Sequence, residues 1–306
     1  MFVRASLLLA IAHAVIPDED WGASLFFFSV SDVFAALPLL MFLPRCLSHF
    51  SHHTRAGYVN VRPGAHSFWW LYGANASAAA RPSLPLVLWL QGGPGASSTG
   101  YGNFGELGPL DWSLQPRPTA WTNAPANLLF VDNPVGAGYS YVDSLDLLPK
   151  TNGDIAKDLV ALMAAFFAKY AELQGTPFYI FTESYGGKMA ASFAPALYAA
   201  VQAGAVKANF KGYVMGDSWI QGTDHVDAWC PFLRKVDLLD DAQLAECLVP
   251  VKRCDAATAA GDWQGAINAW GDTEGVIDGL TDQVDFVRAS PLFCASAARM
   301  EARAPH

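Results

Sequence analysis

One serine stands where this chain could present a nucleophile. The segment 182–187 reads TESYGG and lies between an apolar run at 178–181 and an Ala-rich run at 187–203. A serine on a tight strand-to-helix turn projects its hydroxyl above the sheet, and such turns usually read G-x-S-x-G because small neighbours prevent clashes. Here Thr182 replaces the first glycine. Taken alone, Ser184 could instead be a helix N-cap, since serine is favoured there.

A glycine-rich loop supplies a second candidate element. The segment 91–95 reads QGGPG and directly follows the apolar run 84–90. Glycines let a backbone N–H point at a developing negative charge without a Cβ in the way, as an oxyanion hole requires. A glycine-rich loop can also cradle phosphate, but no lysine stands at the P-loop position. The pattern therefore favours an oxyanion loop.

Four segments extend this pattern in order along the chain. They read WLQGGPGASS at 89–98, ELGP at 106–109, ANLLFVDNPVGAGYS at 126–140 and ESYGG at 183–187. Together they resemble the serine carboxypeptidases, and the segments 178–191 and 216–220 look most like the retinoid-inducible serine carboxypeptidase branch. The resemblance runs from about residue 57 to about residue 287. It implies an α/β-hydrolase fold, with a mostly parallel sheet and helices on both faces.

The resemblance implies catalytic roles for three residues. Ser184 would attack the scissile carbonyl, and the backbone N–H groups of Gly93 and Tyr185 would bind the oxyanion. A serine hydroxyl also needs a base, normally a histidine oriented by an acid, and in this fold the order is Ser, Asp, His. The histidines that follow Ser184 are His225 and His306, and neither stands where the family places its base.

We therefore assign no triad Asp or His in this chain. The later acids Asp278, Asp282 and Asp285 are interpreted as surface residues. The expectation is a C-terminally truncated member of the family that is inactive or nearly so by itself, since removing a triad member costs several orders of magnitude. Loss of the final strands should also expose a sheet edge and favour aggregation.

The resemblance further implies a site for the substrate's C-terminal carboxylate. Gln91 and Glu183 would grip that carboxylate, and Glu106 would hydrogen-bond in the same cluster. Gln91 stands where most of the family has Asn, which has a shorter reach. Two carboxyls and a substrate carboxylate can share a site only if they share protons, which raises their apparent pKa values. Binding is therefore expected to be strongest at acidic pH.

Three functions stay open. The first is a serine-type carboxypeptidase that acts on peptide or protein C-termini through an acyl-enzyme on Ser184. The second is a catalytically silent fold that binds peptide termini or a partner. The third is a serine esterase or acyltransferase of the same fold. Glu183 and Gln91 favour a carboxylate-bearing substrate over a neutral ester. No metal or cofactor is expected, and no cysteine spacing is typical of a metal site.

The elements that must position these residues follow from periodicity. Residues 58–61 and 67–72 predict a hairpin. Four further apolar runs predict buried strands at 84–90, 127–132, 178–181 and 212–216. Residues 154–173 carry an apolar stripe with a spacing of three or four, and 187–203 is similar, so both predict helices. This alternation predicts a parallel sheet, followed after about Trp219 by a small helical cap.

Composition, the N-terminal residues and one sequon indicate the class of protein and its cellular compartment. The 306 residues are 52% hydrophobic and carry a net charge of −9, which predicts one large core and no nucleic-acid footprint. Arg4, the apolar run 5–12 and AHA at 12–14 predict a signal peptide over 1–14, hence a secreted or lysosomal protein. The sequon at Asn75 predicts glycosylation.

Two segments do not fit the domain predicted at 57–287. Residues 24–44 are apolar and are either extraneous, such as a translated intron, or membrane-associated; Asp32 and Pro38 favour the extraneous interpretation slightly. Residues 288–306 show no resemblance to the family. The five cysteines allow at most two internal bridges and are Cys46, Cys230, Cys247, Cys254 and Cys294.

Overall fold

The computed structural model describes residues 54–282 of the protein. The chain divides after Ser218 into two compact units, a sheet-containing unit and a helical one. The predictions for the segments 1–14, 24–44 and 288–306, and for Cys46, Asp285, Cys294 and His306, lie outside the described residues.

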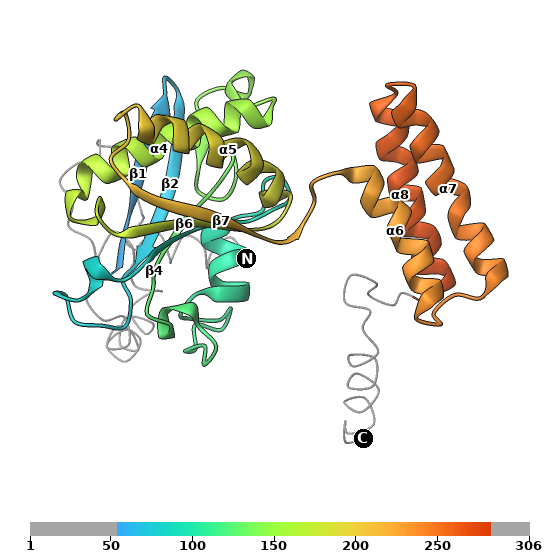
Figure 1. Cartoon of the computed structure of the whole chain (residues 1–306), viewed down its shortest axis with the longest axis horizontal. Helices are drawn as coiled ribbons and strands as arrows, with labels where there is room; N and C mark the ends of the chain where they lie inside the picture. The colour runs from blue at the N-terminus through green and yellow to red at the C-terminus, as the bar shows by residue number, and fades with distance from the viewer. Residues whose placement is uncertain (1–53, 283–306) are drawn as a thin grey trace, which may run out of the picture. The chain divides into compact units, whose positions relative to one another are not determined.

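A seven-stranded sheet forms the centre of the first unit (Figure 1). Its strand order is β1-β2-β4-β3-β6-β7, with β5 paired to β2. The strands are β1 Thr54–Arg62, β2 Ala65–Tyr72, β3 Leu86–Leu90, β4 Asn127–Val131, β5 Tyr141–Val142, β6 Pro177–Ser184 and β7 Asn209–Ser218. β1 and β2 form the predicted antiparallel hairpin, and β4, β3, β6 and β7 run parallel, which confirms the predicted parallel sheet.

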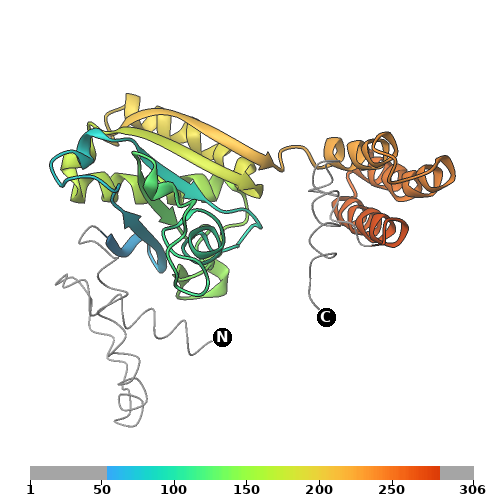
Figure 2. The same ribbon diagram turned by 90° about the horizontal axis from the view of Figure 1, so that it is seen from below.

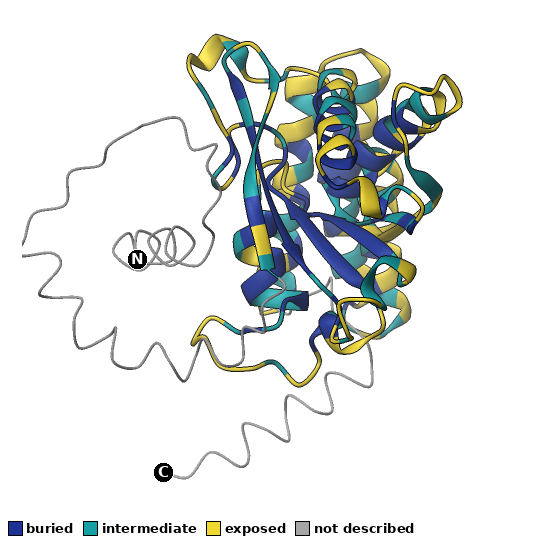
Figure 3. Ribbon diagram, turned by 90° about the vertical axis from the view of Figure 1, so that its left-hand side faces the viewer, coloured by how far each residue is buried: buried dark blue, intermediate teal, exposed yellow. Residues whose placement is uncertain are grey.

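Helices cover the two faces of the sheet unevenly. The long helices α4 Asn152–Lys169 and α5 Tyr185–Gln202 pack against one face, where Phe166 and Phe193 join Leu88 in one buried cluster. The opposite face is covered by the π-helical segment η2 Ser98–Leu107, whose Phe104 packs with Phe130. The central strands are buried by both layers (Figure 3). Apolar side chains on both faces explain why these strands read as continuous apolar runs.

Short helices complete the connections of this unit. They are the 3₁₀ turns η1 Arg81–Ser83, η3 Trp121–Asn123, η4 Leu145–Leu147 and η5 Ala171–Leu173. The helix predicted over 154–173 therefore ends at Lys169 and continues only as η5.

β7 is the last strand of the sheet within residues 54–282. Its side chains Tyr213, Val214 and Met215 are exposed. An apolar strand with unpaired backbone groups on its outer side favours association between chains. We expect aggregation to occur through this exposed edge.

The second unit is a bundle of three helices, which confirms the helical region predicted after Trp219. Its members α6 Gly222–Lys235, α7 Asp241–Ala259 and α8 Trp263–Leu280 lie side by side (Figures 1 and 2). Asp240 caps α7 in a capping box with Gln243. A disulfide joins Cys230 to Cys247 and so links α6 to α7, while Cys254 is buried as a free thiol.

Removing this disulfide is expected to destabilise the helical unit by about 3 kcal/mol, because the bridge closes a short loop and restricts the unfolded chain. The bridged residues are 17 apart in sequence. Denaturant unfolding of a Cys230→Ser/Cys247→Ser variant, followed by circular dichroism, measures the loss. The matched control is the wild-type protein in reductant, which should lose the same amount, whereas the variant should not respond to reductant.

None of the helices within 54–282 combines the length and apolarity needed to cross a bilayer.

Candidate active site

Ser184 occupies the turn between β6 and α5. It is the last residue of β6, and its backbone angles are φ 52° and ψ −126°. Residues other than glycine avoid this region, so the turn holds Ser184 in a strained conformation. Its side chain makes no capping hydrogen bond to α5. Helix capping therefore does not explain this serine, which lies on the tight strand-to-helix turn that the sequence predicts.

The glycine-rich loop lies directly against this turn. A Cβ on Gly92 would lie 2.8 Å from the Cβ of Ser184 and 2.9 Å from the backbone nitrogen of Tyr185. A Cβ on Gly186 would lie 2.6 Å from the carbonyl oxygen of Leu90. The backbone of the loop can approach the backbone of the turn this closely only because Gly92 and Gly186 have no side chain.

Two backbone N–H groups are candidates for the oxyanion site. Tyr185 is the first residue of α5, so its N–H has no acceptor within the helix. Gly93 follows Gly92 in the loop and has a φ of 112°, which glycine adopts freely. The structure thus brings the loop that carries Gly93 to the turn that carries Tyr185.

An amide and two carboxyl groups form a hydrogen-bonded cluster beside Ser184. Gln91 Nε2 donates to Glu183 Oε2 at 2.6 Å and lies 3.3 Å from Glu106 Oε1. The indole N–H of Trp89 donates to Gln91 Oε1 at 2.7 Å, which turns the amide nitrogen toward the acids. The structure therefore brings together the three residues for which the sequence predicted a common site.

Glu106 has an unusual proton affinity in this cluster. Burial raises its pKa to about 7, and a hydrogen bond with Glu183 and the charge of that neighbour act in the same direction. The Gln91 amide and the charge of Arg117 oppose the rise only in part. Two carboxyls in contact cannot both stay ionised without a large repulsion, so Glu106 holds a proton at mildly acidic pH.

The histidines within residues 54–282 are His66 and His225. His66 lies on β2 and interacts with Asn60 and Asp143. His225 lies on α6 and stacks on Trp219. Asp278 and Asp282 are exposed, as predicted. Within residues 54–282 there is also no group of three or more His, Cys, Asp or Glu side chains that could hold a metal ion.

Sequence reasoning missed several residues that support the cluster. Trp89, Ser98 and Asp132 stand inside the motifs at 89–98 and 126–140, but no role was predicted for them. Arg117, which hydrogen-bonds to the carbonyl oxygens of Phe104 and Gly108, had no sequence signal. Contacts of this kind depend on side-chain direction, which periodicity does not reveal.

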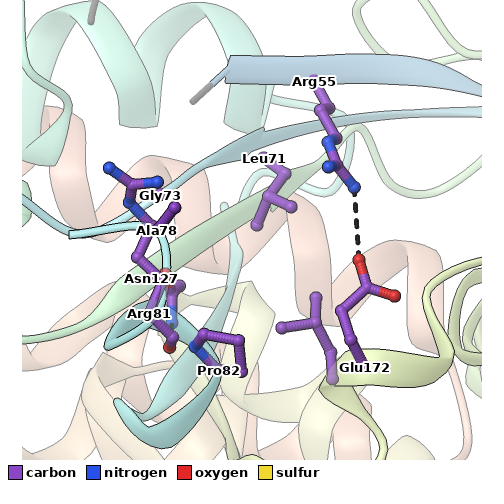
Figure 4. A pocket seen from close by; sticks show the side chains of 9 residues that line it. Arg55, Leu71, Gly73, Ala78, Arg81, Pro82, Asn127 and Glu172 are labelled. Carbon is purple, nitrogen blue, oxygen red and sulfur yellow. Dashed lines mark hydrogen bonds and ion pairs between the residues drawn. The ribbon is translucent and has the colours of Figure 1, made fainter. Parts of the chain in front are cut away.

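A cavity lies at the other end of the strands (Figure 4). This cavity of about 380 Å³ is bordered by Pro82, which precedes β3, and by Asn127, the first residue of β4. An ion pair between Arg55 and Glu172, with a separation of 3.4 Å, crosses it. Ser184 stands at the carboxyl end of β6, so this cavity is separate from the cluster.

Comparison with known proteins shows to which family this chain belongs. A family model described as Serine carboxypeptidase matches residues 44–283. The chain belongs to the serine carboxypeptidase family. The retinoid-inducible serine carboxypeptidase of Mus musculus is 50% identical over 229 residues, which cover 75% of this chain and 50% of the relative. Serine carboxypeptidase-like 51 of Arabidopsis thaliana is 41% identical over 263 residues, 82% of this chain and 57% of that relative.

The solved structure of a carboxypeptidase confirms the fold. The prohormone-processing carboxypeptidase of Saccharomyces cerevisiae superposes with a TM-score of 0.64 at 20% identity, covering 74% of this chain and 53% of that one. The predicted α/β-hydrolase fold is therefore correct. This serine carboxypeptidase chain spans about half the length of the curated relatives from mouse, human and rat that it matches.

Proposed function

We propose that Ser184 is the nucleophile of a serine-type carboxypeptidase, which releases the C-terminal residue of a peptide. The observation that carries this proposal is the cluster of Gln91, Glu106 and Glu183 next to Ser184, with its 2.6 Å hydrogen bond between amide and acid. An amide donor and a shared proton suit a substrate carboxylate. A neutral ester carries no carboxylate for these groups to bind.

The chemistry follows from the placement of each group. The Ser184 oxygen would attack the carbonyl carbon of the last peptide bond while its proton passes to a base. The negative charge that develops on the carbonyl oxygen would be stabilised by the N–H groups of Gly93 and Tyr185. The base then gives its proton to the leaving nitrogen as the C–N bond breaks, the C-terminal amino acid leaves, and water hydrolyses the Ser184 ester. We assign the role of base to no residue within 54–282.

The carboxylate cluster would select the substrate. A C-terminal carboxylate brings a further negative charge beside Glu106 and Glu183, which is favourable only while Glu106 is protonated. The Gln91 N–H group and the protonated acid would then donate to it. This requirement distinguishes peptides with a free C-terminus from amidated peptides and simple esters.

Labelling with a fluorophosphonate tests the proposal. Attack by Ser184 forms an O–P bond and releases fluoride and a proton, so the expected product is the protein modified at Ser184, formed slowly because no base has been assigned to activate the hydroxyl. The Ser184→Ala variant should stay unmodified. No modification of wild-type protein would favour the catalytically silent alternative instead. If Ser184 is modified but amidated and free peptides compete equally, the esterase alternative takes precedence over the carboxypeptidase.

We further propose that the protein enters the secretory pathway. The disulfide between Cys230 and Cys247 supports this, because such bonds form in oxidising compartments. Asn75 is exposed, as a glycosylation site must be. A secreted product whose mass does not change on removal of N-glycans would contradict glycosylation at Asn75.

A further inference from the structure

Asp132 is a buried carboxylate surrounded by hydrogen-bond donors. It follows β4 directly and is 0% exposed. Ser97 Oγ donates to its Oδ1 at 2.8 Å and the Thr99 N–H at 2.9 Å. Thr99 Oγ1 donates to Oδ2 at 2.7 Å and the Tyr139 N–H at 2.8 Å. A carboxylate is costly to bury without such partners, so these four bonds fix its neighbours firmly.

Three consecutive hydroxyl residues connect Asp132 to the carboxylate cluster. Asp132 holds the outer two, Ser97 and Thr99. The hydroxyl of the middle one, Ser98, accepts a hydrogen bond from the backbone N–H of Gln91 at 3.0 Å. The position of the Gln91 backbone, and so of its amide side chain, therefore depends on a turn that Asp132 holds.

The same turn begins the helical segment that carries Glu106. Ser97 caps η2 by accepting from the Gly100 N–H at 2.8 Å, and Asp132 adds a negative charge at that end of η2. Negative charge at a helix N-terminus is favourable. Asp132 therefore affects Glu106 through η2 as well as Gln91 through Ser98.

Asp132 is itself anchored to the sheet. Its carbonyl oxygen accepts from Ser140 Oγ at 2.6 Å, and Ser140 Oγ accepts from the Phe68 N–H on β2 at 2.7 Å. The Asp132 carboxylate therefore holds the loop at 97–99 in a fixed position relative to β2 and β4.

We propose that Asp132 is a positioning residue for the carboxylate cluster: it fixes the turn 97–99 and through it the amide of Gln91 and the carboxyl of Glu106. This inference rests on the proposed function in so far as the cluster binds a substrate carboxylate. Asp132 does not touch that substrate itself.

An Asp132→Asn variant tests the inference, because the amide keeps one acceptor oxygen and places an NH₂ group against donors. We expect faster hydrogen exchange in residues 92–107 and at least about tenfold weaker binding of N-benzoyl-phenylalanyl-leucine, roughly the effect of one charge-assisted hydrogen bond. The pH at which binding is lost should also shift, since the pKa of Glu106 depends on its distance from Glu183.

The matched control is Asp158→Asn. Asp158 is also buried, but it accepts from Arg62 Nε at 2.9 Å and stands on α4. This variant should leave exchange at 92–107, peptide affinity and the pH profile unchanged. If Asp132→Asn behaves like Asp158→Asn, the positioning role is wrong.

A milder variant covers the case in which Asp132→Asn does not fold. Thr99→Val removes a single donor to Asp132 and should still accelerate exchange at 92–107; wild-type exchange in that variant would equally overturn the inference. Failure of the wild-type protein to bind the benzoyl dipeptide would count against the proposed function. The exchange measurement does not depend on that binding and decides the positioning role separately.

Discussion

Replacing Gly92 with alanine is expected to slow phosphonylation of Ser184 by about 100-fold or more, the effect of losing an oxyanion donor. The new methyl group would lie 2.8 Å from Ser184 Cβ and 2.9 Å from both the Glu183 carbonyl oxygen and the Tyr185 nitrogen. Two of these neighbours are backbone atoms and cannot rotate away. The loop must therefore move off the turn, and the N–H of Gly93 moves with it.

The control for this prediction is Gly175→Ala, because a Cβ at Gly175 meets nothing within 4 Å. The rate of labelling at Ser184, followed by mass spectrometry, should be unchanged in that variant. The melting temperature of Gly92→Ala should also fall, since overpacking of this kind typically costs about 1–3 kcal/mol. Wild-type labelling in Gly92→Ala would show that the loop does not form the oxyanion site.

The affinity for a peptide C-terminus is expected to fall about tenfold for each pH unit above about 7, because one proton must then be taken up on binding. The sign follows from Glu106, whose pKa is raised to about 7 from an ordinary 4.5. Below about pH 7 the proton is present and the substrate carboxylate can enter. Titration of N-benzoyl-phenylalanyl-leucine against the protein over a pH series measures this slope.

The Glu106→Gln variant provides the comparison. An amide cannot ionise, so the loss of affinity above about pH 7 should largely disappear. The same shift affects stability: the folded state holds this proton more tightly than the unfolded chain, so the contribution of Glu106 falls as pH rises from 4.5 to about 7. An unaltered pH profile in Glu106→Gln would show that another group controls binding.

The fold was predictable where buried strands appear in the sequence as apolar runs. The runs 84–90 and 127–132 are apolar because both faces of β3 and β4 are covered, and both predictions are confirmed. The strand predicted at 178–181 extends to Ser184 in the structure, since Thr182 and Glu183 pair with β7. The apolar pattern does not predict this extension, because the side chains of Thr182 and Glu183, at the end of the strand where the site begins, are polar.

The site was predictable only as a set of motifs. Gln91, Glu106 and Glu183 were expected to share one site and do so, although they come from three separate segments. The direction of the Gln91 amide was not predictable, because it depends on the Trp89 indole. The disulfide pairing was likewise open, since five cysteines allow several combinations and helix packing selects Cys230 and Cys247.

The backbone of Ser184 also bears on how this protein could be engineered. Its angles of φ 52° and ψ −126° cost a non-glycine residue on the order of 1–3 kcal/mol. A directed-evolution screen that rewards heat resistance alone would therefore favour glycine at position 184. The most heat-resistant variants would then lack the Ser184 hydroxyl. Such a library should therefore keep the codon for Ser184 unchanged and select for labelling of Ser184 together with thermal tolerance.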